Sequence, residues 1–396
     1  MSEATLPVPA EIQRAPGRAL AVGVAGLLLT VLGGVADREQ LFRSYHFAFL
    51  FWVGLGVGCL SVLLIQFVTG GFWGVAIRRV LEAGSRTLVL GPVLFLPVAF
   101  GIGVLFEWAH PEAVAADPIL QHKAAYLNPT FFFARAALFF ACWIGLSHLV
   151  TTWSARLDRG DASVAGRLEA VSGLGLVLLA LTITFSSVDW GMALNAHWFS
   201  TIYGVLFMVG QALAALALAT LTVARFVGEP PYSRVISSGT VHDLGKLTLA
   251  FVMLWAYVSF SQFLIVWSGN LPEEIPWYAL RTRGAWGGVA IALVIFHFAL
   301  PFLLLLSRDI KRNVRLMGGI AAALLLMRVV DLYWLVGPDL HGHAGAAGAG
   351  LHWMDVTAFL GVGGVWAWFY ARQLGSRPLL PLGEPEVQRR MQGVEA

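Results

Sequence analysis

The stretch SYHFAFLFWVGLGVGCLSVLLIQFVT, residues 44–69, decides the fold class of this chain. It contains no Asp, Glu, Lys or Arg, and it is longer than the ~20 mostly apolar residues that a helix needs to cross a bilayer. A backbone in lipid has no water to bond with, so it must satisfy its own N–H and C=O groups. The stretch therefore predicts a membrane-spanning α-helix.

The composition of the whole chain agrees with a membrane protein. Of its 396 residues, 58% are hydrophobic and only 12% are charged, and the mean hydropathy is +0.74. The charged share is about half that of a soluble globular domain, and so few charges could not cover the surface of a water-soluble fold of this length. The sequence thus excludes a soluble enzyme, a disordered protein and a disulfide-rich secreted domain.

Further apolar spans follow the same logic, and together they predict an all-α integral membrane protein with ten transmembrane helices. The expected spans are 17–35, 44–69, 84–108, 129–153, 171–190, 199–226, 243–267, 284–306, 313–336 and 352–372. We expect two four-helix bundles, formed by spans two to five and six to nine, plus two flanking helices. Residues 1–16 are then a cytoplasmic leader, 17–372 the transmembrane domain and 373–396 a cytoplasmic tail.

Lys and Arg residues set the expected orientation, because cytoplasmic loops carry an excess of them. With the N-terminus inside, most of the 26 Lys and Arg fall on the cytoplasmic side, while Arg135 and Arg328 lie within spans. Both termini are then cytoplasmic, as an even number of helices requires. The basic runs at Arg78–Arg79 and Arg308–Arg315 are expected to be cytoplasmic anchors. The net charge of +3 reflects such residues and indicates no nucleic-acid partner.

The two cysteines limit the redox chemistry that this chain can carry. Cys59 and Cys142 both lie inside apolar spans, and no CxxC or CxxCH motif occurs. Without CxxCH a c-type haem has no attachment point, and two cysteines cannot hold an iron–sulfur cluster. We therefore expect no metal site and no covalently bound cofactor in this chain.

Ionisable residues inside spans are the first candidates for function, because each costs roughly 2.5–3.5 kcal/mol at the centre of an inserting helix. One group falls in the outer half of the predicted membrane region: Arg135, Asp189, His197, Arg328, Asp331, His352 and Asp355. A cavity lined by such residues could hold a quinol headgroup, with a His–carboxylate pair accepting the hydroxyl protons. The alternative is a set of structural ion pairs, since Arg328 and Asp331 are three residues apart and share a helix face.

A second group lies toward the cytoplasmic side and could form a proton path. Its members are His148, His242, Asp243, Lys246, Tyr257 and His297, with Thr182 and Ser259 as neutral steps. Relays across membranes use such side chains, bridged by water. His297 lies deepest, and Pro301 behind it frees a backbone carbonyl. The alternative is local: Asp243 suits the first turn of a helix, and Lys246 can reach the lipid headgroups.

The loop SGNLPEEIPWY, residues 268–278, is expected on the outer side. Glu273 and Glu274 lie between two prolines, close to Trp277. A rigid, acidic and aromatic loop of this kind is more typical of a docking surface for a partner subunit than of a catalytic loop.

Several long runs resemble one family of bacterial respiratory proteins. They are LIQFVTGGFWGVAIRRVLEAGSRTL (64–88), HKAAYLN (122–128), DWGMALNAHWFSTIYGVLFMVGQALAA (189–215), HDLGKLTLAFVMLWAYVSFSQFLIVWSGNLPEEIPWY (242–278) and FHFALPFLLLLSRDIKRN (296–313). These runs are similar to the quinone-binding subunit 2 family of bacterial alternative complex III, a quinol:cytochrome c oxidoreductase. That family is related to the NrfD/PsrC-like membrane proteins and resembles this chain over about residues 40 to 380.

The resemblance implies a ten-helix protein of the bacterial inner (cytoplasmic) membrane, beside a second, NrfD-like subunit that binds quinol. It implies a multihaem cytochrome c and an iron–sulfur subunit as further partners, which carry the haems and clusters, with membrane lipids around them. Quinone or quinol is the candidate ligand. The expected function is support of quinol oxidation and conduction of protons. The alternatives are a purely structural anchor of the complex and a stand-alone secondary transporter.

Polar positions carry over from the family motif by motif. The matching residues are Asp189, His197, His242, Asp243, Lys246, Glu273, Glu274, His297 and Asp309. One motif departs from the family pattern, which reads Leu-Glu-Pro-His-Trp after the Asp-Trp pair. Here Asn195 and Ala196 precede His197, so the acid of that motif is absent.

Overall fold

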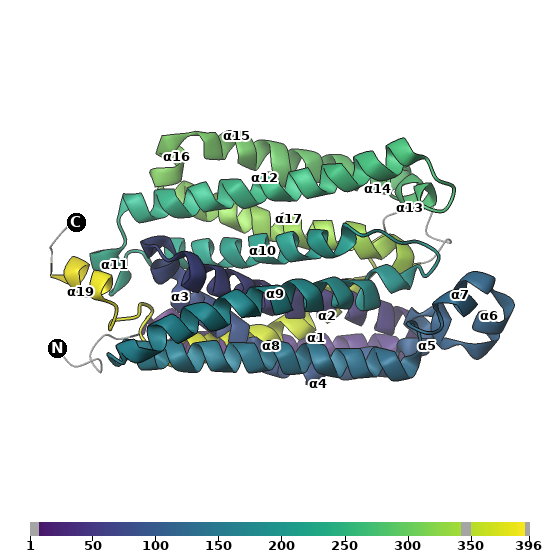
Figure 1. The fold of residues 1–396 in the computed structure, drawn as a ribbon, viewed down its shortest axis with the longest axis horizontal. Coiled ribbons are helices and arrows are strands. Elements are labelled where there is room, and N and C mark those ends of the chain that lie inside the picture. Colours follow the sequence, from purple (N-terminus) through teal and green to yellow (C-terminus); the bar gives the residue numbers. More distant parts are fainter. Residues whose placement is uncertain (1–7, 342–349, 393–396) are drawn as a thin grey trace.

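The computed structural model describes residues 8–341 and 350–392, and within these ranges the chain is all-helical. Long helices run back and forth along one axis (Figure 1). In order they are α1 (Ala10–Ala36), α2 (Arg38–Thr69), α3 (Phe72–Arg86) continued by α4 (Gly91–Phe100), α8 (Pro129–Asp158), α9 (Ala165–Trp190), α10 (Tyr203–Phe226), α12 (Ser238–Gly269), α14 (Gly284–Ala292) continued by α15 (Leu300–Leu306), α17 (Val314–Leu340) and α18 (Trp353–Leu374). Because successive helices alternate in direction, both ends of the described chain lie at the same end of the bundle (Figure 1).

Short helices join the long ones at the two ends of the bundle. The end that holds the termini, called the termini end below, has α11 (Tyr232–Val235), α16 (Arg308–Arg312) and α19 (Pro385–Met391). The opposite, distal end has α5 (Ile102–Leu105), α6 (Pro111–Ala116), α7 (Pro118–Lys123) and α13 (Ile275–Arg281). The segment from α5 to α7 extends beyond the long helices (Figure 1).

Nine helical segments in the described residues are long and apolar enough to cross a membrane, judged by length and composition. This agrees with the prediction of an α-helical, multi-pass membrane protein. The tenth predicted span corresponds to α18, which is 22 residues long and is not among the nine. This helix nevertheless packs against α1 and α2 in the same bundle.

The third predicted span, 84–108, is misplaced at both ends. The structure has one helical segment from Phe72 to Phe100, formed by α3, a 3₁₀ turn and α4. Its first half carries Arg78, Arg79 and Glu82, which are buried where α3 packs against α2 and α8. A hydropathy pattern assigns such charges to a loop, because it does not register the partners that neutralise them.

The helix α2 forms the centre of the bundle. In the most apolar 18-residue stretch of α2, 89% of the residues are buried. The corresponding shares are 22% for α1 and 28% for α12. It packs against α3, α9, α10 and α18, and α10 in turn packs against α12 and α17. On the peripheral helices, Leu32, Leu138 and Leu303 are more than half exposed. An apolar outer surface of this kind is what lipid contact requires.

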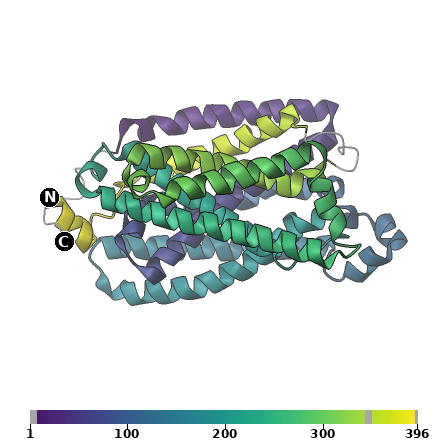
Figure 2. The same ribbon diagram turned by 90° about the horizontal axis from the view of Figure 1, so that it is seen from above.

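The helix α1 is held against α18 by the close approach of two backbones. Figure 2 shows α1 along one edge of the bundle, with α18 beside it. A Cβ atom added to Gly26 would lie 2.6 Å from the backbone nitrogen of Gly361, and one added to Gly361 would lie 2.7 Å from that of Leu27. Only glycine allows this distance, and small residues are the usual basis of helix association in lipid.

Candidate functional site

The seven residues of the predicted outer site fall into four separate clusters, the first of which joins α8 to α9. Arg135 donates from Nε and Nη2 to the two carboxylate oxygens of Asp189, at 2.7 and 3.0 Å. It also donates to the Tyr126 carbonyl at 3.0 Å, and its guanidinium lies 3.8 Å from the centre of the Tyr126 ring. Asp189 is fully buried. This two-point ionic bond is among the stronger contacts that can fix one helix against another.

The second cluster lies in the loops of the distal end. His197 Nε2 and Asp117 Oδ2 are 2.5 Å apart, and the two side chains are 43% and 26% exposed. Asp117 also caps α7, because its carboxylate accepts from the backbone N–H of Ile119 at 2.7 Å. The hydrogen bond with His197 holds the pKa of the Asp117 carboxyl below its usual range. This contact therefore ties the loop after α9 to α7.

The third cluster is the ion pair between Arg328 and Asp331 on α17, both nearly fully buried. Asp331 also accepts a hydrogen bond from Trp255 Nε1 on α12 at 3.1 Å. The Arg328 guanidinium covers Gly210 of α10, where an added Cβ would lie 2.4 Å from Arg328 Cζ. Glycine at this position makes room for the cation. The structure thus contains the pair that the helical spacing of three residues predicted.

His297 lies next to this pair, in the π-helical segment Leu293–Ala299 between α14 and α15. Its ring packs edge-on against Trp255, with 4.4 Å between the ring centres. The side chain is fully buried, and neither ring nitrogen has a hydrogen-bond partner among the described residues. π-helical turns often occur at functional sites, and a buried polar group without a partner is rare enough to require an explanation.

The fourth cluster surrounds Asp355 in the first turn of α18. Its carboxylate accepts from Ser44 Oγ at 2.6 Å, Gln40 Nε2 at 3.3 Å, Tyr333 OH at 3.4 Å and the backbone N–H of His352 at 2.8 Å. His352 is the N-cap residue of α18, so the two predicted site residues together form a capping box. Asp355 therefore both begins a helix and joins it to α2 and α17.

The structure does not bring these seven residues together around one cavity. A cavity of about 350 Å³ does lie at the distal end, between the end of α7, the segment that precedes α8, and the end of α9 with the loop that follows it. Its lining includes Lys123, Tyr126, Met192, Trp198 and Phe199, and it is mainly apolar. None of the seven residues lines it, because their carboxylates and guanidinium groups bond to one another or to neighbouring helices.

The predicted proton-path residues are also dispersed. His148, Asp243, Lys246 and Tyr257 are exposed, and His242 is half-buried. Asp243 and Lys246 pair with each other at 2.8 Å on the surface of α12, and Tyr257 is 69% exposed on the same helix. The outward-facing side of α12 carries these groups, so they point away from the bundle interior. Of the six residues, His297 is the one that is fully buried.

The loop 268–278 is only partly the surface that its sequence suggested. Glu273 is exposed and Glu274 is half-buried. Trp277, in contrast, is buried in α13, where it stacks on Trp198 with 4.5 Å between ring centres and an angle of 11°. The Arg281 guanidinium lies 3.6 Å from the centre of the Trp277 ring. Both contacts use the Trp277 ring inside the chain, so this residue does not contribute to a docking surface.

A buried polar seam, most of which the sequence did not predict, follows the interface of α3, α8 and α9. We define the polar seam as Glu82, Ser85, Trp143, Ser147, Ser154 and Thr182, of which only Thr182 was a predicted candidate. Ser154 Oγ donates to Glu82 Oε1 at 2.5 Å, and Ser147 Oγ donates to Ser85 Oγ at 3.2 Å. Trp143 Nε1 donates to Thr182 Oγ1 at 2.9 Å. The available signal was Ser147 and Ser154 seven residues apart, on one face of an apolar helix.

Two small cavities extend the polar seam toward the Arg328–Asp331 pair. The first is lined by Trp143, Ser186 and Gln211, among others, and the second by Gln211 and Arg328. Each encloses about 10 Å³, which is room for roughly one water molecule. Gln211 Oε1 is buried and has no hydrogen-bond partner in the described part of the chain. Gln211 thus lies between the polar seam and the ion pair.

The polar seam ends in a group of charges at the termini end. Arg79 pairs with Glu82 at 2.7 Å and also with Asp158, while Arg78 pairs with Glu384 at 2.9 Å. Arg78 and Arg79 are only 3% and 7% exposed. Both arginines are therefore packed inside the chain, and the expectation that this basic run is an anchor on the cytoplasmic side stays a prediction. Carboxylates far along the chain neutralise the two arginines and allow them to be buried.

The chemistry of these clusters has to be argued from their own geometry. Among the described residues, no three or more His, Cys, Asp or Glu side chains are grouped so that they could hold a metal ion. No model of a known protein family matches the chain, and no curated protein matches it either.

Proposed function

We propose that this chain is an integral membrane subunit of a bacterial respiratory quinol:electron-acceptor oxidoreductase, in which it conducts protons and scaffolds partner subunits. In this proposal ten helices, α18 included, cross the inner (cytoplasmic) membrane as two four-helix bundles flanked by α1 and α18. The termini end is cytoplasmic. The runs that resemble quinone-binding subunit 2 of alternative complex III support the assignment. Haems and iron–sulfur clusters belong to a multihaem cytochrome c and an iron–sulfur partner, and quinol belongs to an NrfD-like partner.

The observation that carries the proton-conducting role is the position of the Arg328–Asp331 pair. Other buried arginines reach a carboxylate on another element: Arg135 of α8 bonds to Asp189 of α9, Arg79 of α3 to Asp158 of α8 as well as to Glu82 of its own helix, and Arg281 of α13 to Asp339 of α17. Arg328 and Asp331 lie on one helix, so their ionic bond cross-links no helices. Each charge is nevertheless costly inside a membrane. Asp331 contacts α12 through the neutral donor Trp255 Nε1, and a buried ion pair kept at this cost is consistent with a functional role.

The surroundings of the pair are suited to proton transfer. His297 lies on one side with two free nitrogens, and Gln211 lies on the other with a free oxygen, among the described residues. From Gln211 the polar seam leads to Glu82 near the termini end. Serine and threonine hydroxyls can both donate and accept, and water in the two small cavities can bridge the distance from Trp143 through Gln211 to Arg328. In this proposal these groups carry protons to Asp331 from the cytoplasmic side.

A quinol headgroup fits the outer clusters poorly. A carboxylate has about four lone-pair sites, and the four donors around Asp355 occupy them. Asp189 has both oxygens bonded to Arg135. Donors of the chain therefore already engage both oxygens of each acid, and neither acid is among the residues that line the cavity of about 350 Å³ at the distal end. For this reason we assign quinol binding to a partner subunit.

The membership of a complex is tested by co-purification. The full-length protein, tagged at its C-terminus, is isolated from native membranes in a mild detergent. We expect it to bring a multihaem cytochrome c, seen in the haem absorption spectrum, and an iron–sulfur subunit, seen by electron paramagnetic resonance. Isolation of this chain alone would refute the complex and favour the stand-alone transporter.

The proton-conducting role is tested with the assembled complex in liposomes. We expect Asp331→Asn to leave quinol oxidation measurable but to lower the number of protons moved per electron toward background. Glu39→Gln is the control, because it removes an exposed acid that pairs with Arg43 on the surface of α2. If Asp331→Asn changes neither quinol oxidation nor proton movement once assembly is normal, the chain is a purely structural anchor.

A further inference from the structure

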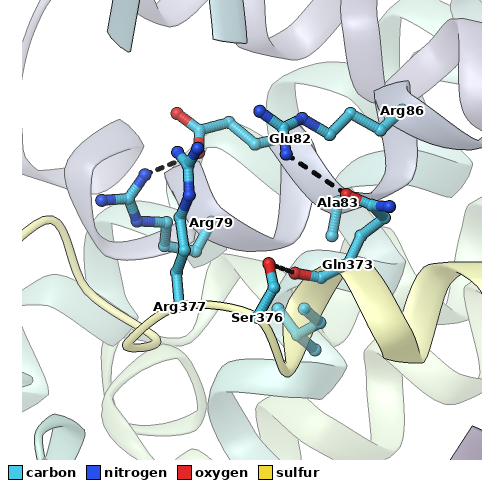
Figure 3. Close-up of a pocket in the computed structure, with 8 residues that line it drawn as sticks. Arg79, Glu82, Ala83, Arg86, Gln373, Ser376 and Arg377 are labelled. Carbon is cyan, nitrogen blue, oxygen red and sulfur yellow. Dashed lines mark hydrogen bonds and ion pairs between the residues drawn. The ribbon is translucent and has the colours of Figure 1, made fainter. Parts of the chain in front are cut away.

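A pocket lined by arginines lies at the termini end, where the C-terminal segment passes the end of α3. Figure 3 shows Arg86, from α3, and Arg377, from the segment after α18, at the same small pocket. Its lining also includes Arg79, Glu82, Gln373 and Ser376. Three guanidinium groups and a single carboxylate therefore border one opening.

Arg86 and Arg377 carry charge that the described chain does not neutralise. Arg79, the third arginine, is already paired with two carboxylates. No ion pair within residues 8–341 and 350–392 includes Arg86 or Arg377. Arg86 donates from Nη1 to Gln373 Oε1 at 3.2 Å (Figure 3). The site thus has an excess of positive charge and guanidinium N–H groups that are not engaged by acids.

The shape of the pocket limits where a ligand can bind. Arg86 and Arg377 are half-buried and Ser376 is exposed, so the pocket opens to the surface of the termini end. The enclosed space is about 10 Å³, which takes roughly one water molecule. An anion must therefore lie at the mouth of the pocket, with one oxygen directed inward. Guanidinium forks bind such oxyanions through two parallel hydrogen bonds, a geometry that suits phosphate.

We propose that Arg86 and Arg377 bind the phosphate group of an anionic ligand. The phosphate belongs either to the headgroup of an anionic phospholipid in the leaflet at the termini end or to free phosphate. The position at the ends of spanning helices favours the lipid, because basic pockets between helices on the cytoplasmic side bind such headgroups. The pocket shares Glu82 with the polar seam, but the binding of phosphate by Arg86 and Arg377 does not require the respiratory role proposed above.

The test uses the full-length protein, stripped of native lipid in detergent and examined by native mass spectrometry. Phosphatidylglycerol is the main probe, phosphatidylcholine is the comparison without net charge, and inorganic phosphate is a separate arm. We expect preferential retention of phosphatidylglycerol, and a roughly fivefold loss of retention in Arg377→Gln. The matched control is Arg372→Gln, which removes an exposed arginine one turn earlier, at the end of α18, and should change nothing.

Each outcome of this experiment decides a separate point. If inorganic phosphate binds with the same dependence on Arg377, the site accepts free phosphate; if it does not bind, the site is specific for the lipid headgroup. The proposal is overturned if Arg377→Gln leaves the binding of both probes unchanged, or if Arg372→Gln lowers lipid retention equally. Arg86→Gln, on the other element, repeats the test, and thermal unfolding of each variant confirms that the protein is folded.

Discussion

The ionic bond between Arg135 and Asp189 offers the sharpest test of how this bundle is held together. Asp189 is fully buried and the Arg135 side chain is 15% exposed. If one partner is removed, water can therefore replace few of the hydrogen bonds that the other partner loses. Removing one partner of a buried pair leaves an uncompensated charge and costs about 3–5 kcal/mol. In Asp189→Asn, Arg135 retains the Tyr126 carbonyl and ring. We therefore expect the lower end, about 3 kcal/mol of the free energy of unfolding.

A double-mutant cycle separates the pair from its surroundings. The variants are Asp189→Asn, Arg135→Met and the double variant, each unfolded in mixed detergent micelles and followed by circular dichroism. The double variant removes both charges, so its cost should be about 2 kcal/mol smaller than the sum of the two single costs, which is the coupling expected for residues in contact. Glu39→Gln is the control for an exposed pair, and its cost should stay below about 1 kcal/mol.

Two results would refute this reasoning. If Asp189→Asn costs no more than the exposed control, burial does not make the pair strong. If the cost of the double variant in free energy of unfolding equals the sum of the two single costs, Arg135 and Asp189 contribute independently. The association of α8 with α9 must then come from packing alone.

Three further predictions concern the helix contacts and the distal end. Gly361→Leu should destabilise the packing of α1 on α18 by roughly 2 kcal/mol or more, because even its Cβ would meet the Leu27 backbone nitrogen at 2.7 Å; thermal unfolding measures this. Asp355→Asn should leave the affinity of the complex for a quinone analogue unchanged while lowering the melting temperature, since its oxygens are engaged by the protein. The pKa of Asp117 is lowered, so its bond to His197 stabilises the fold above about pH 4 and is lost as the pH falls further. The difference in melting temperature between wild type and Asp117→Asn should therefore disappear as the pH falls below about 4.

Hydropathy and helical spacing predicted the parts of this structure that depend on local sequence. The apolar stretch 44–69 became the central helix α2, and the spacing of Arg328 and Asp331 gave an ion pair on one helix face. His352 and Asp355 are also three residues apart, but they form the capping box of α18 and not an ion pair on one helix face. Each of these features is decided within a few turns of one helix, which is the range that sequence periodicity reports.

Contacts between distant segments could not be predicted in this way. The burial of Arg78 and Arg79 could not be predicted because two of their three partners, Asp158 and Glu384, lie far along the chain, whereas Glu82 lies on the same helix. Trp277 read as a docking residue because its stacking on Trp198 depends on how two loops meet. The sequence also did not predict which faces of α12 and α8 are exposed and which are buried. An almost uniformly apolar helix has no periodic pattern that distinguishes a face toward lipid from a face toward protein.

Buried charges in this protein therefore divide by what they connect. Arg135, Arg79 and Arg281 each reach a carboxylate on another element, and the resulting bonds offset part of the cost of taking the charges out of water. Arg328 reaches a carboxylate on its own helix, and that carboxylate contacts a second helix through a neutral donor, Trp255 Nε1 of α12. The same location has a buried histidine without partners and a glutamine oxygen without one, among the described residues. The proton transfer that we propose for Asp331 rests on these neighbouring groups, because ionised and unsatisfied groups inside an apolar bundle are costly to stability.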